Sequence, residues 1–289
     1  MNKWVAGARP RTLPAAVVPV AVGTACAVGE AASGIIWWRV VAAAVVSLAL
    51  QIGTNYANDY SDGVKGTDEV RVGPIRLVAG KLATPRAVKR AALASFGVAA
   101  LAGLALTIAV GPILLVVGAA AIAAGWFYTG GSHPYGYYGF GEVFVFVFFG
   151  LVATVGTTYV LVERVTGLSA LAAVGVGLLA CALLVVNNLR DIPTDTVAGK
   201  KTLAVRIGDA KTRTLYSTLM VLAILIGAGC AFAGRPWAGI VLASFALAVA
   251  PIKTIRGGAV GRALIAVLGA TGRLQLAFGL LLTVGLALR

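Results

Sequence analysis

Two short acidic sequences interrupt an otherwise apolar chain, and their residue patterns resemble each other. Each has Asn-x-x-x-Asp at the end of a long apolar run and another Asp three or four residues later: Asn55, Asp59 and Asp62 in the first, Asn187, Asp191 and Asp195 in the second. Residues three or four apart lie on one face of a helix, so each sequence is expected to aim two carboxylates in one direction. Carboxylates are costly to place near a lipid bilayer, and there they usually mark a functional site.

Carboxylate and amide oxygens without His or Cys beside them are the ligands that Mg²⁺ prefers. Mg²⁺ also tends to share its coordination shell with substrate phosphates. The two acidic sequences therefore predict a diphosphate that is held through Mg²⁺. The predicted metal ligands, which are also the predicted catalytic residues, are Asp59, Asp62, Asp191 and Asp195. The competing interpretation is that these carboxylates only pair with Lys and Arg side chains at the membrane surface.

A loop that combines glycines with cations follows each acidic sequence. Such cations are suited to binding a diphosphate and to stabilising it as a leaving group, although a solvated basic loop would look similar. The predicted substrate-binding set combines cations of these loops with Arg11 near the N-terminus, the neighbouring amides and one tyrosine: Arg11, Asn55, Asn58, Lys65, Arg76, Tyr128, Asn187, Asn188, Lys200 and Lys201.

The elements that carry these residues are expected to be membrane-spanning helices. The chain of 289 residues is 60% hydrophobic and 12% charged, with a mean hydropathy of +0.94, whereas a soluble domain has roughly a quarter charged residues. Apolar stretches long enough to cross a bilayer recur along it. We expect one all-α, membrane-embedded domain over 1–289 with nine spans: 13–29, 37–57, 87–109, 111–129, 142–162, 168–189, 214–233, 236–255 and 268–288.

The positions of the cations indicate how these spans are oriented. Of the 24 lysines and arginines, all but Arg39, Arg164, Arg235 and Arg289 lie on one side of the nine-span arrangement. The positive-inside rule then places the N-terminus in the cytoplasm and the C-terminus outside. The net charge of +14 is explained by this topology and by affinity for anionic lipid or phosphate. Because no separate basic domain exists, nucleic-acid binding is not expected.

The two acidic sequences end spans 37–57 and 168–189, which have the same orientation in this arrangement. That relation suggests an internal repeat with parallel topology, whose two halves meet at the cytoplasmic mouth of a cavity. Pro193 is expected to end the regular hydrogen bonding of the second of these helices around Asp191 and to free backbone carbonyls as possible ligands, because proline lacks a backbone N–H.

The chain resembles the UbiA superfamily of intramembrane aromatic prenyltransferases over essentially its full length. Within that family it is similar to the branch that prenylates 1,4-dihydroxy-2-naphthoate in menaquinone synthesis. The resemblance is carried by the two acidic sequences and by the residues around them: 8–14, 58–63, 66–68, 71–74, 187–191 and 199–206.

This resemblance implies a Mg²⁺-dependent transfer of a polyprenyl group from a polyprenyl diphosphate to 1,4-dihydroxy-2-naphthoate. Carbon dioxide and diphosphate are lost, and demethylmenaquinone is formed. The resemblance also implies a multi-pass protein of the bacterial plasma membrane whose site opens to the cytoplasm. Phe144, Phe146, Phe148 and Phe149 are expected either to line a tunnel for the isoprenoid or simply to pack against neighbouring helices.

Two other functions are compatible with parts of the sequence. One is prenyl transfer to another acceptor of the same family, such as 4-hydroxybenzoate, a chlorin or haem. The other is secondary transport, for which acidic residues on repeated helices are ordinary. Acidic helix ends beside cation-rich loops favour the enzyme. The sequence assigns no role to Asp68, His133 or Glu142.

Overall fold

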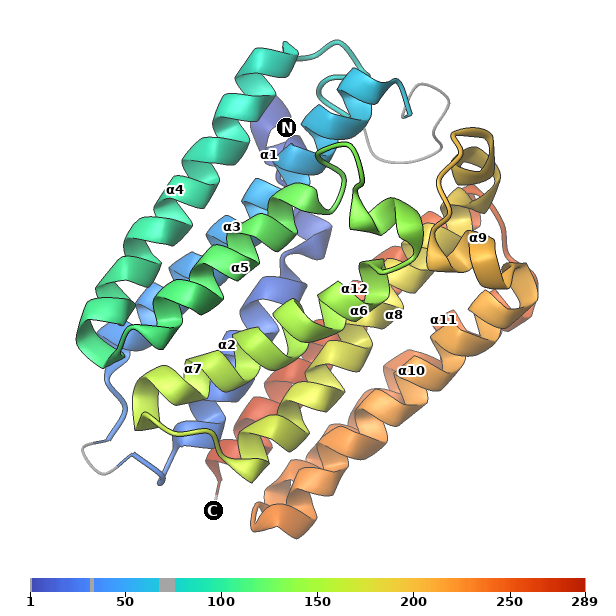
Figure 1. Cartoon of the computed structure of the whole chain (residues 1–289). Helices are drawn as coiled ribbons and strands as arrows, with labels where there is room; N and C mark the ends of the chain where they lie inside the picture. The colour runs from blue at the N-terminus through green and yellow to red at the C-terminus, as the bar shows by residue number, and fades with distance from the viewer. Residues whose placement is uncertain (1, 32–33, 68–75, 289) are drawn as a thin grey trace.

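The computed structural model describes residues 2–31, 34–67 and 76–288, and within these ranges every regular element is a helix. Figure 1 shows long helices packed side by side, with the N- and C-termini at opposite ends of the bundle. The first half contains α1 (Lys3–Gly7), η1 (Pro10–Thr12), α2 (Pro14–Ala27), α3 (Trp37–Lys65), α4 (Pro85–Val110), α5 (Ile113–Phe127), η2 (Tyr135–Tyr138), α6 (Gly141–Val145), η3 (Phe146–Val152) and α7 (Ala153–Val162). The second half contains α8 (Gly167–Val197), α9 (Leu203–Ile207), α10 (Asp209–Gly229), η4 (Cys230–Ala233), η5 (Pro236–Ser244), α11 (Phe245–Arg256) and α12 (Arg262–Ala287).

Seven helical segments in the described part of the chain are long and apolar enough to cross a membrane, and α2 and α5 are apolar but shorter. These segments coincide with the predicted spans, which confirms an all-α, multi-pass membrane protein. The number of crossings and the orientation of the termini stay predictions.

The two helices that carry the acidic sequences are longer than predicted. α3 continues past residue 57 to Lys65, and α8 continues past residue 189 to Val197. The expectation that Pro193 ends the regular hydrogen bonding of the second helix was wrong, because α8 continues beyond it to Val197. Pro193 removes the backbone donor that would reach the carbonyl of Leu189. The hydroxyl groups of Thr194 and Thr196 donate hydrogen bonds to the backbone carbonyls of Asp191 and Ile192. Both acidic sequences therefore lie on regular helix.

α8 lies at the centre of the second half of the bundle, since 72% of the residues in its apolar stretch are buried. It contacts α2, α10, α12 and the segment formed by α6, η3 and α7, while α3 packs mainly against α4. η3 is a π-helical turn, a feature that often marks functional sites. At its contact with α8 the backbones come close, because a Cβ added to Gly150 would lie only 2.5 Å from the Cα atom of Gly177.

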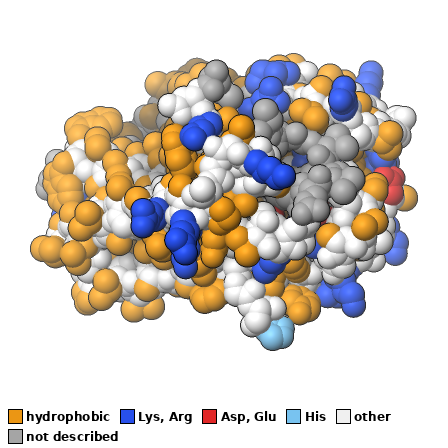
Figure 2. Space-filling view, turned by 90° about the horizontal axis from the view of Figure 1, so that it is seen from above, with side chains coloured by type: hydrophobic (Ala, Val, Ile, Leu, Met, Phe, Trp, Pro, Cys, Tyr) orange, Lys and Arg blue, Asp and Glu red, His pale blue; other side chains and the backbone are white. Residues whose placement is uncertain are grey.

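The polar connections gather at the end of the bundle where the chain begins (Figure 1). Figure 2 looks onto this end and shows Lys and Arg side chains spread over the face, with apolar side chains around it. This arrangement agrees with the charge asymmetry on which the predicted orientation is based.

Val165, 66% exposed between α7 and α8, and Val260, 68% exposed between α11 and α12, are predicted to face opposite sides of the membrane. We expect a membrane-impermeant maleimide to label Val165→Cys in intact cells, and Val260→Cys only after permeabilisation. Both substitutions are made in a chain whose three buried cysteines are replaced by alanine. Labelling of both positions in intact cells would contradict the predicted orientation.

Gly150→Val is expected to lower the free energy of unfolding by about 1–3 kcal/mol, the usual cost of overpacking a tight contact. The measurement is the thermal midpoint of the purified protein in detergent. Gly97→Ala is the matched control, because Gly97 lies exposed on α4 and its added Cβ has no atom within 4 Å. If the two variants unfold at the same temperature, the helices are not in close contact at Gly150.

Candidate active site

A cavity of about 680 Å³ lies inside the bundle, between α3, α5, α8 and the segment 141–162. Its walls differ in polarity from one end to the other. The polar part is lined by Arg9, Arg11, Asn55, Asn58, Asp62, Arg76, Tyr128, Asn187, Asn188, Asp191, Asp195 and Lys200. Three predicted site residues, Asp59, Lys65 and Lys201, do not line it. The structure thus brings both acidic sequences to one cavity, as the sequence predicted.

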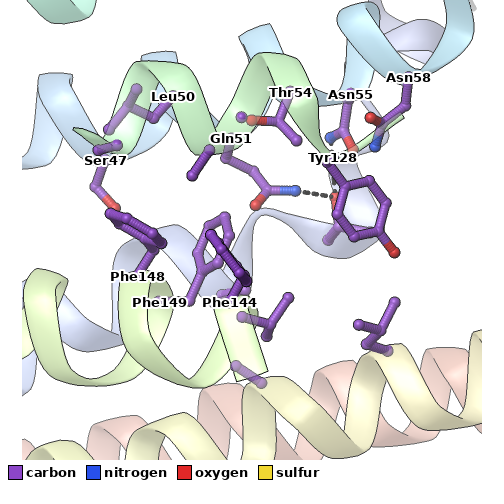
Figure 3. A pocket seen from close by; sticks show the side chains of 18 of the residues that line it. Ser47, Leu50, Gln51, Thr54, Asn55, Asn58, Tyr128, Phe144, Phe148 and Phe149 are labelled. Carbon is purple, nitrogen blue, oxygen red and sulfur yellow. Dashed lines mark hydrogen bonds between the residues drawn. The ribbon is translucent and has the colours of Figure 1, made fainter. Parts of the chain in front are cut away.

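The rest of the cavity is mostly apolar. Phe144, Phe148 and Phe149 line it from the segment 141–162, and Figure 3 shows their rings facing side chains of α3. Phe146, predicted with them, packs elsewhere: a Cβ added to Gly177 of α8 would lie 2.8 Å from its ring. Away from its polar part, the cavity continues to Leu106, near the C-terminal end of α4, and to Val160, near the C-terminal end of α7.

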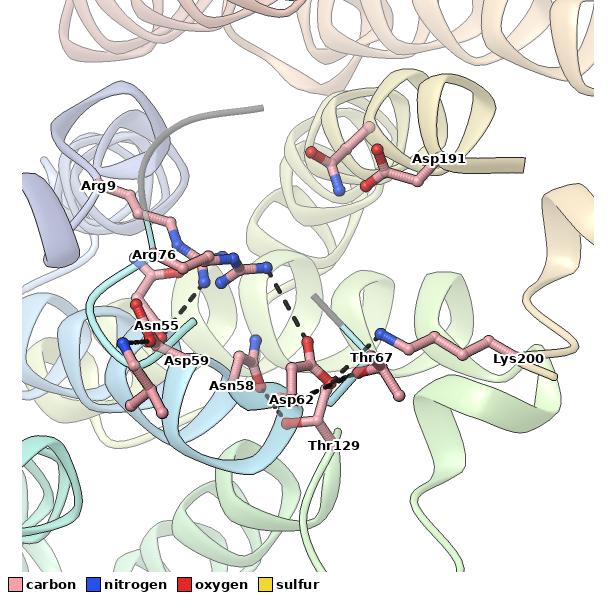
Figure 4. Close-up of polar contacts among 12 residues, drawn as sticks. Arg9, Asn55, Asn58, Asp59, Asp62, Thr67, Arg76, Thr129, Asp191 and Lys200 are labelled. Atoms are coloured by element: carbon pink, nitrogen blue, oxygen red, sulfur yellow. Dashed lines mark hydrogen bonds and ion pairs between the residues drawn. The ribbon is translucent and has the colours of Figure 1, made fainter. Parts of the chain in front are cut away.

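Asp62 is the carboxylate of α3 that reaches the cavity, and it is only 4% exposed. Its Oδ1 atom accepts a hydrogen bond from the Tyr137 hydroxyl at 2.5 Å and lies 3.3 Å from Lys200 Nζ. Its Oδ2 atom lies 3.9 Å from Arg76 Nη2 (Figure 4). Charged and hydroxyl donors therefore fix the orientation of this buried carboxylate.

Asp59 has a different environment. Its two carboxylate oxygens accept hydrogen bonds from the backbone N–H groups of Leu77 and Val78, at 2.8 and 3.0 Å, and the residue is 1% exposed. This differs from the expectation that Asp59 and Asp62 face the same way. Residues three apart on a helix are offset by about 60° around its axis. The turn that follows Arg76 packs against the side of α3 that carries Asp59. Asp59 thereby fixes the segment that carries Arg76.

The second acidic sequence lies across the cavity on α8 (Figure 4). Arg190 pairs with Asp191 through two parallel hydrogen bonds, Nε to Oδ1 at 2.7 Å and Nη2 to Oδ2 at 2.8 Å. The same guanidinium donates to Asn187 Oδ1 at 2.8 Å. Asp195 lies one turn further and also lines the cavity. Such a partner offsets part of the cost of burying the carboxylate in a helical bundle.

The amide side chains are held by neighbouring groups. Asn58 Oδ1 accepts a hydrogen bond from the Thr129 hydroxyl at 2.9 Å, and Asn55 Nδ2 donates to the carbonyl of Ala8 at 2.9 Å. Tyr128 follows α5 and faces the same space (Figure 3).

Lys65 and Lys201 lie beside a smaller pocket on the other side of Tyr137. Lys65 Nζ donates to the carbonyls of Thr129 and Gly131 at 2.7 and 3.1 Å. The ring of Tyr137 has Lys65 Nζ 5.0 Å and Lys200 Nζ 4.7 Å from its centroid, within the range of cation–π contacts. The sequence around Arg71 and Asp68 lies outside the described residues.

The donors on the two walls are carboxylate and amide oxygens, a set that fits Mg²⁺ and not a thiophilic metal. Within residues 2–31, 34–67 and 76–288, no three acidic, His or Cys side chains are grouped closely enough to hold a metal ion. The carboxylates instead stand on opposite walls, where a ligand that itself supplies oxygens would complete a coordination shell.

Known proteins share this architecture and sequence. A family model for the UbiA prenyltransferase family matches residues 16–257. The chain belongs to this family. It is 51% identical to the 1,4-dihydroxy-2-naphthoate octaprenyltransferase of Mycobacterium tuberculosis, over 99% of this chain and 97% of that protein. It is 38% identical to the enzyme of the same name from Escherichia coli, over 75% of this chain and 72% of that protein.

Solved structures of other UbiA-family proteins have the same fold. A UbiA homolog from Aeropyrum pernix superposes with a TM-score of 0.69 at 13% identity, covering 94% of this chain and 96% of that one. A UbiA homolog from Archaeoglobus fulgidus bound to GPP and Mg²⁺ superposes with a TM-score of 0.65 at 15% identity, covering 98% and 100%.

In this UbiA-family protein, sequence reasoning missed two residues that organise the polar end: Arg190 and Thr129. The position of Arg190 beside Asp191 was the available signal for the first. Tyr137 and Thr129 lie in the connection between α5 and α6, far from both acidic sequences, so nothing local in the sequence indicated that they contact α3.

Tyr137→Phe is expected to slow diphosphate release from a polyprenyl diphosphate about tenfold or more, because it removes a hydrogen bond to a buried carboxylate that contributes about 1.5–3 kcal/mol. Initial rates at saturating Mg²⁺ measure the effect. Tyr138→Phe is the control, since the Tyr138 ring is 43% exposed and stacks on His133. Equal rates for the two variants would show that the Tyr137 hydroxyl does not organise the site.

Proposed function

We propose that this protein, acting as a single membrane-embedded domain over residues 1–289, transfers a polyprenyl group from a polyprenyl diphosphate to 1,4-dihydroxy-2-naphthoate. We place it in a bacterial plasma membrane, with the polar end of the cavity open to the cytoplasm. The observation that carries the proposal is one cavity with buried charges at one end and phenylalanine rings along its length. A polyprenyl diphosphate has the same division between a charged head and a long apolar tail.

At the polar end, Asp62, Asp191 and Asp195 are the residues that would hold Mg²⁺ together with the diphosphate. When bound, Mg²⁺ withdraws charge from the diphosphate and makes it a better leaving group. Arg76 and Lys200, both buried, are placed to neutralise the negative charge that develops on the departing oxygen. Asp59 does not contact the cavity and acts indirectly, by fixing the segment that carries Arg76.

The apolar part of the cavity holds the isoprenoid chain and keeps water from the reacting carbon. Phe144 and Phe148, whose rings stack 6.1 Å apart, form part of this wall. Exclusion of water matters because an allylic cation that met water would form an alcohol in place of the prenylated ring. Tyr128, which lines the cavity at the junction of the two parts, presents a ring face suited to a cation.

In the reaction, the bond between C1 of the isoprenoid and the diphosphate oxygen breaks, and its electron pair leaves with the diphosphate. The electron-rich naphthoate ring supplies the pair for the new carbon–carbon bond. The carboxyl group leaves as CO₂, and the electrons of its bond return to the ring. No electrons are removed from the ring, so the immediate product is the hydroquinone form of demethylmenaquinone, which corrects the quinone implied by the family resemblance.

The choice of 1,4-dihydroxy-2-naphthoate over 4-hydroxybenzoate, a chlorin or haem is supported by the relatives of highest coverage. The Mycobacterium tuberculosis protein that is 51% identical over nearly the full chain is named for this acceptor. Secondary transport has less support, because the acidic side chains sit at one end of the cavity beside Arg76 and Lys200.

The test is a single-turnover assay with a radiolabelled polyprenyl diphosphate, 1,4-dihydroxy-2-naphthoate and Mg²⁺. We expect prenylated product and CO₂ from the wild type, and no product after chelation until Mg²⁺ is restored. Asp191→Asn is expected to slow turnover about 100-fold or more, the usual effect of removing a group that stabilises charge in the transition state.

Asp209→Asn is the matched control, because Asp209 is an exposed aspartate of α10 that pairs with Arg213. Its turnover should match the wild type. Turnover that persists under chelation would overturn the metal-dependent mechanism. Prenylation of 4-hydroxybenzoate with no CO₂ release from the naphthoate would overturn the proposed acceptor.

A further inference from the structure

Glu142 is a buried carboxylate that the mechanism above does not use. It lies in the first turn of α6 and is 7% exposed. It does not line the cavity, but its neighbour Asn188 on α8 does. Glu142 forms no ion pair with the described residues, and its Oε2 atom is buried without a hydrogen-bond partner among them. Burying a carboxylate under these conditions is costly, which suggests that the residue is kept for a function.

The one side-chain partner of Glu142 in the described part of the chain is the Asn188 amide, whose Nδ2 atom donates to Oε1 at 2.9 Å. The surroundings hold the acid in place. Cys181 Sγ donates to its backbone carbonyl at 3.1 Å, and a Cβ added to Gly141 would lie 3.4 Å from the Tyr128 hydroxyl. The first turn of α6 is thus packed between α8 and Tyr128, behind the cavity wall, and its carboxylate faces Asn188.

A carboxylate can only accept hydrogen bonds, so it requires the NH₂ group of the Asn188 amide to point toward it. The amide oxygen of Asn188 is then left as the atom available to the cavity. Asn188 precedes Asp191 by three residues and shares its helix face. The structure therefore places a neutral hydrogen-bond acceptor beside the proposed diphosphate site. The charged residues around it are those proposed to bind the diphosphate.

We infer that Glu142 is a positioning residue for the aromatic acceptor: it holds the Asn188 amide so that the amide oxygen accepts a hydrogen bond from a phenolic hydroxyl of the dihydroxynaphthoate. This inference rests on the proposed function. The hydrogen bond places the ring next to C1 of the isoprenoid. It also leaves more electron density on the phenolic oxygen, which makes the ring a better nucleophile.

The experiment compares Glu142→Gln with the wild type in steady-state assays that vary each substrate separately. Glutamine keeps the size of the side chain, but it can donate as well as accept, so the Asn188 amide is no longer held in one orientation. We expect the KM for 1,4-dihydroxy-2-naphthoate to rise about fivefold or more, the effect of losing a buried hydrogen bond between neutral groups. The KM for the polyprenyl diphosphate should change less than about twofold.

The reciprocal exchange separates this role from simple packing. Asn188→Asp alone puts two carboxylates together and should also raise the acceptor KM. The Glu142→Gln, Asn188→Asp double variant restores one donor facing one carboxylate and leaves an oxygen toward the cavity, so it should recover most of the acceptor affinity. Glu163→Gln is the control, because Glu163 follows the same helical segment, pairs with Arg39 and is 55% exposed.

Three outcomes would overturn the inference. These are an unchanged acceptor KM in Glu142→Gln, an equal rise in both KM values, or a double variant no better than its worse parent. A wild-type enzyme that does not prenylate the naphthoate would overturn the proposed function as well. The wild-type rate therefore distinguishes failure of the function from failure of the inference.

Discussion

The structure depends on the need to compensate buried charge inside an apolar helical bundle. Each carboxylate taken out of water must find donors, or its burial would destabilise the fold by several kcal/mol. Three aspartates solve this problem in different ways: Asp59 accepts two backbone N–H groups, Asp62 accepts from Tyr137 and Lys200, and Asp191 is held by the fork of Arg190. These compensations fix the side chains before any substrate arrives, which is the condition for effective electrostatic catalysis.

The same constraint explains why charge and apolar surface share one cavity. The residues that compensate the carboxylates come from α3, α8 and the connections at one end of the bundle, so the polar groups are confined to that end. The rest of the cavity is lined mostly by aliphatic and aromatic side chains. A ligand must match both parts, with an anionic head and a long apolar tail. Membership of the UbiA prenyltransferase family agrees with this division.

The segment 141–162 has two tasks in this arrangement. Its phenylalanines line the apolar part of the cavity, and its first turn places Glu142 against Asn188 of α8. The close approach of Gly150 to Gly177 keeps the segment tightly on α8. Under the proposed function, this segment positions the acceptor and the prenyl chain, and other elements position the diphosphate.

By itself, the sequence determined the helical class, the approximate helix ranges and the residues around which the site is built, because hydropathy and Asn-x-x-x-Asp spacing are local properties of the chain. It did not determine where each side chain points. Asp59 and Asp62 are three residues apart, yet only Asp62 reaches the cavity, and Pro193 does not end its helix. Tertiary structure decided these points, because donors from distant segments, such as the amides of residues 77 and 78 and the hydroxyl of Tyr137, compete for each buried carboxylate.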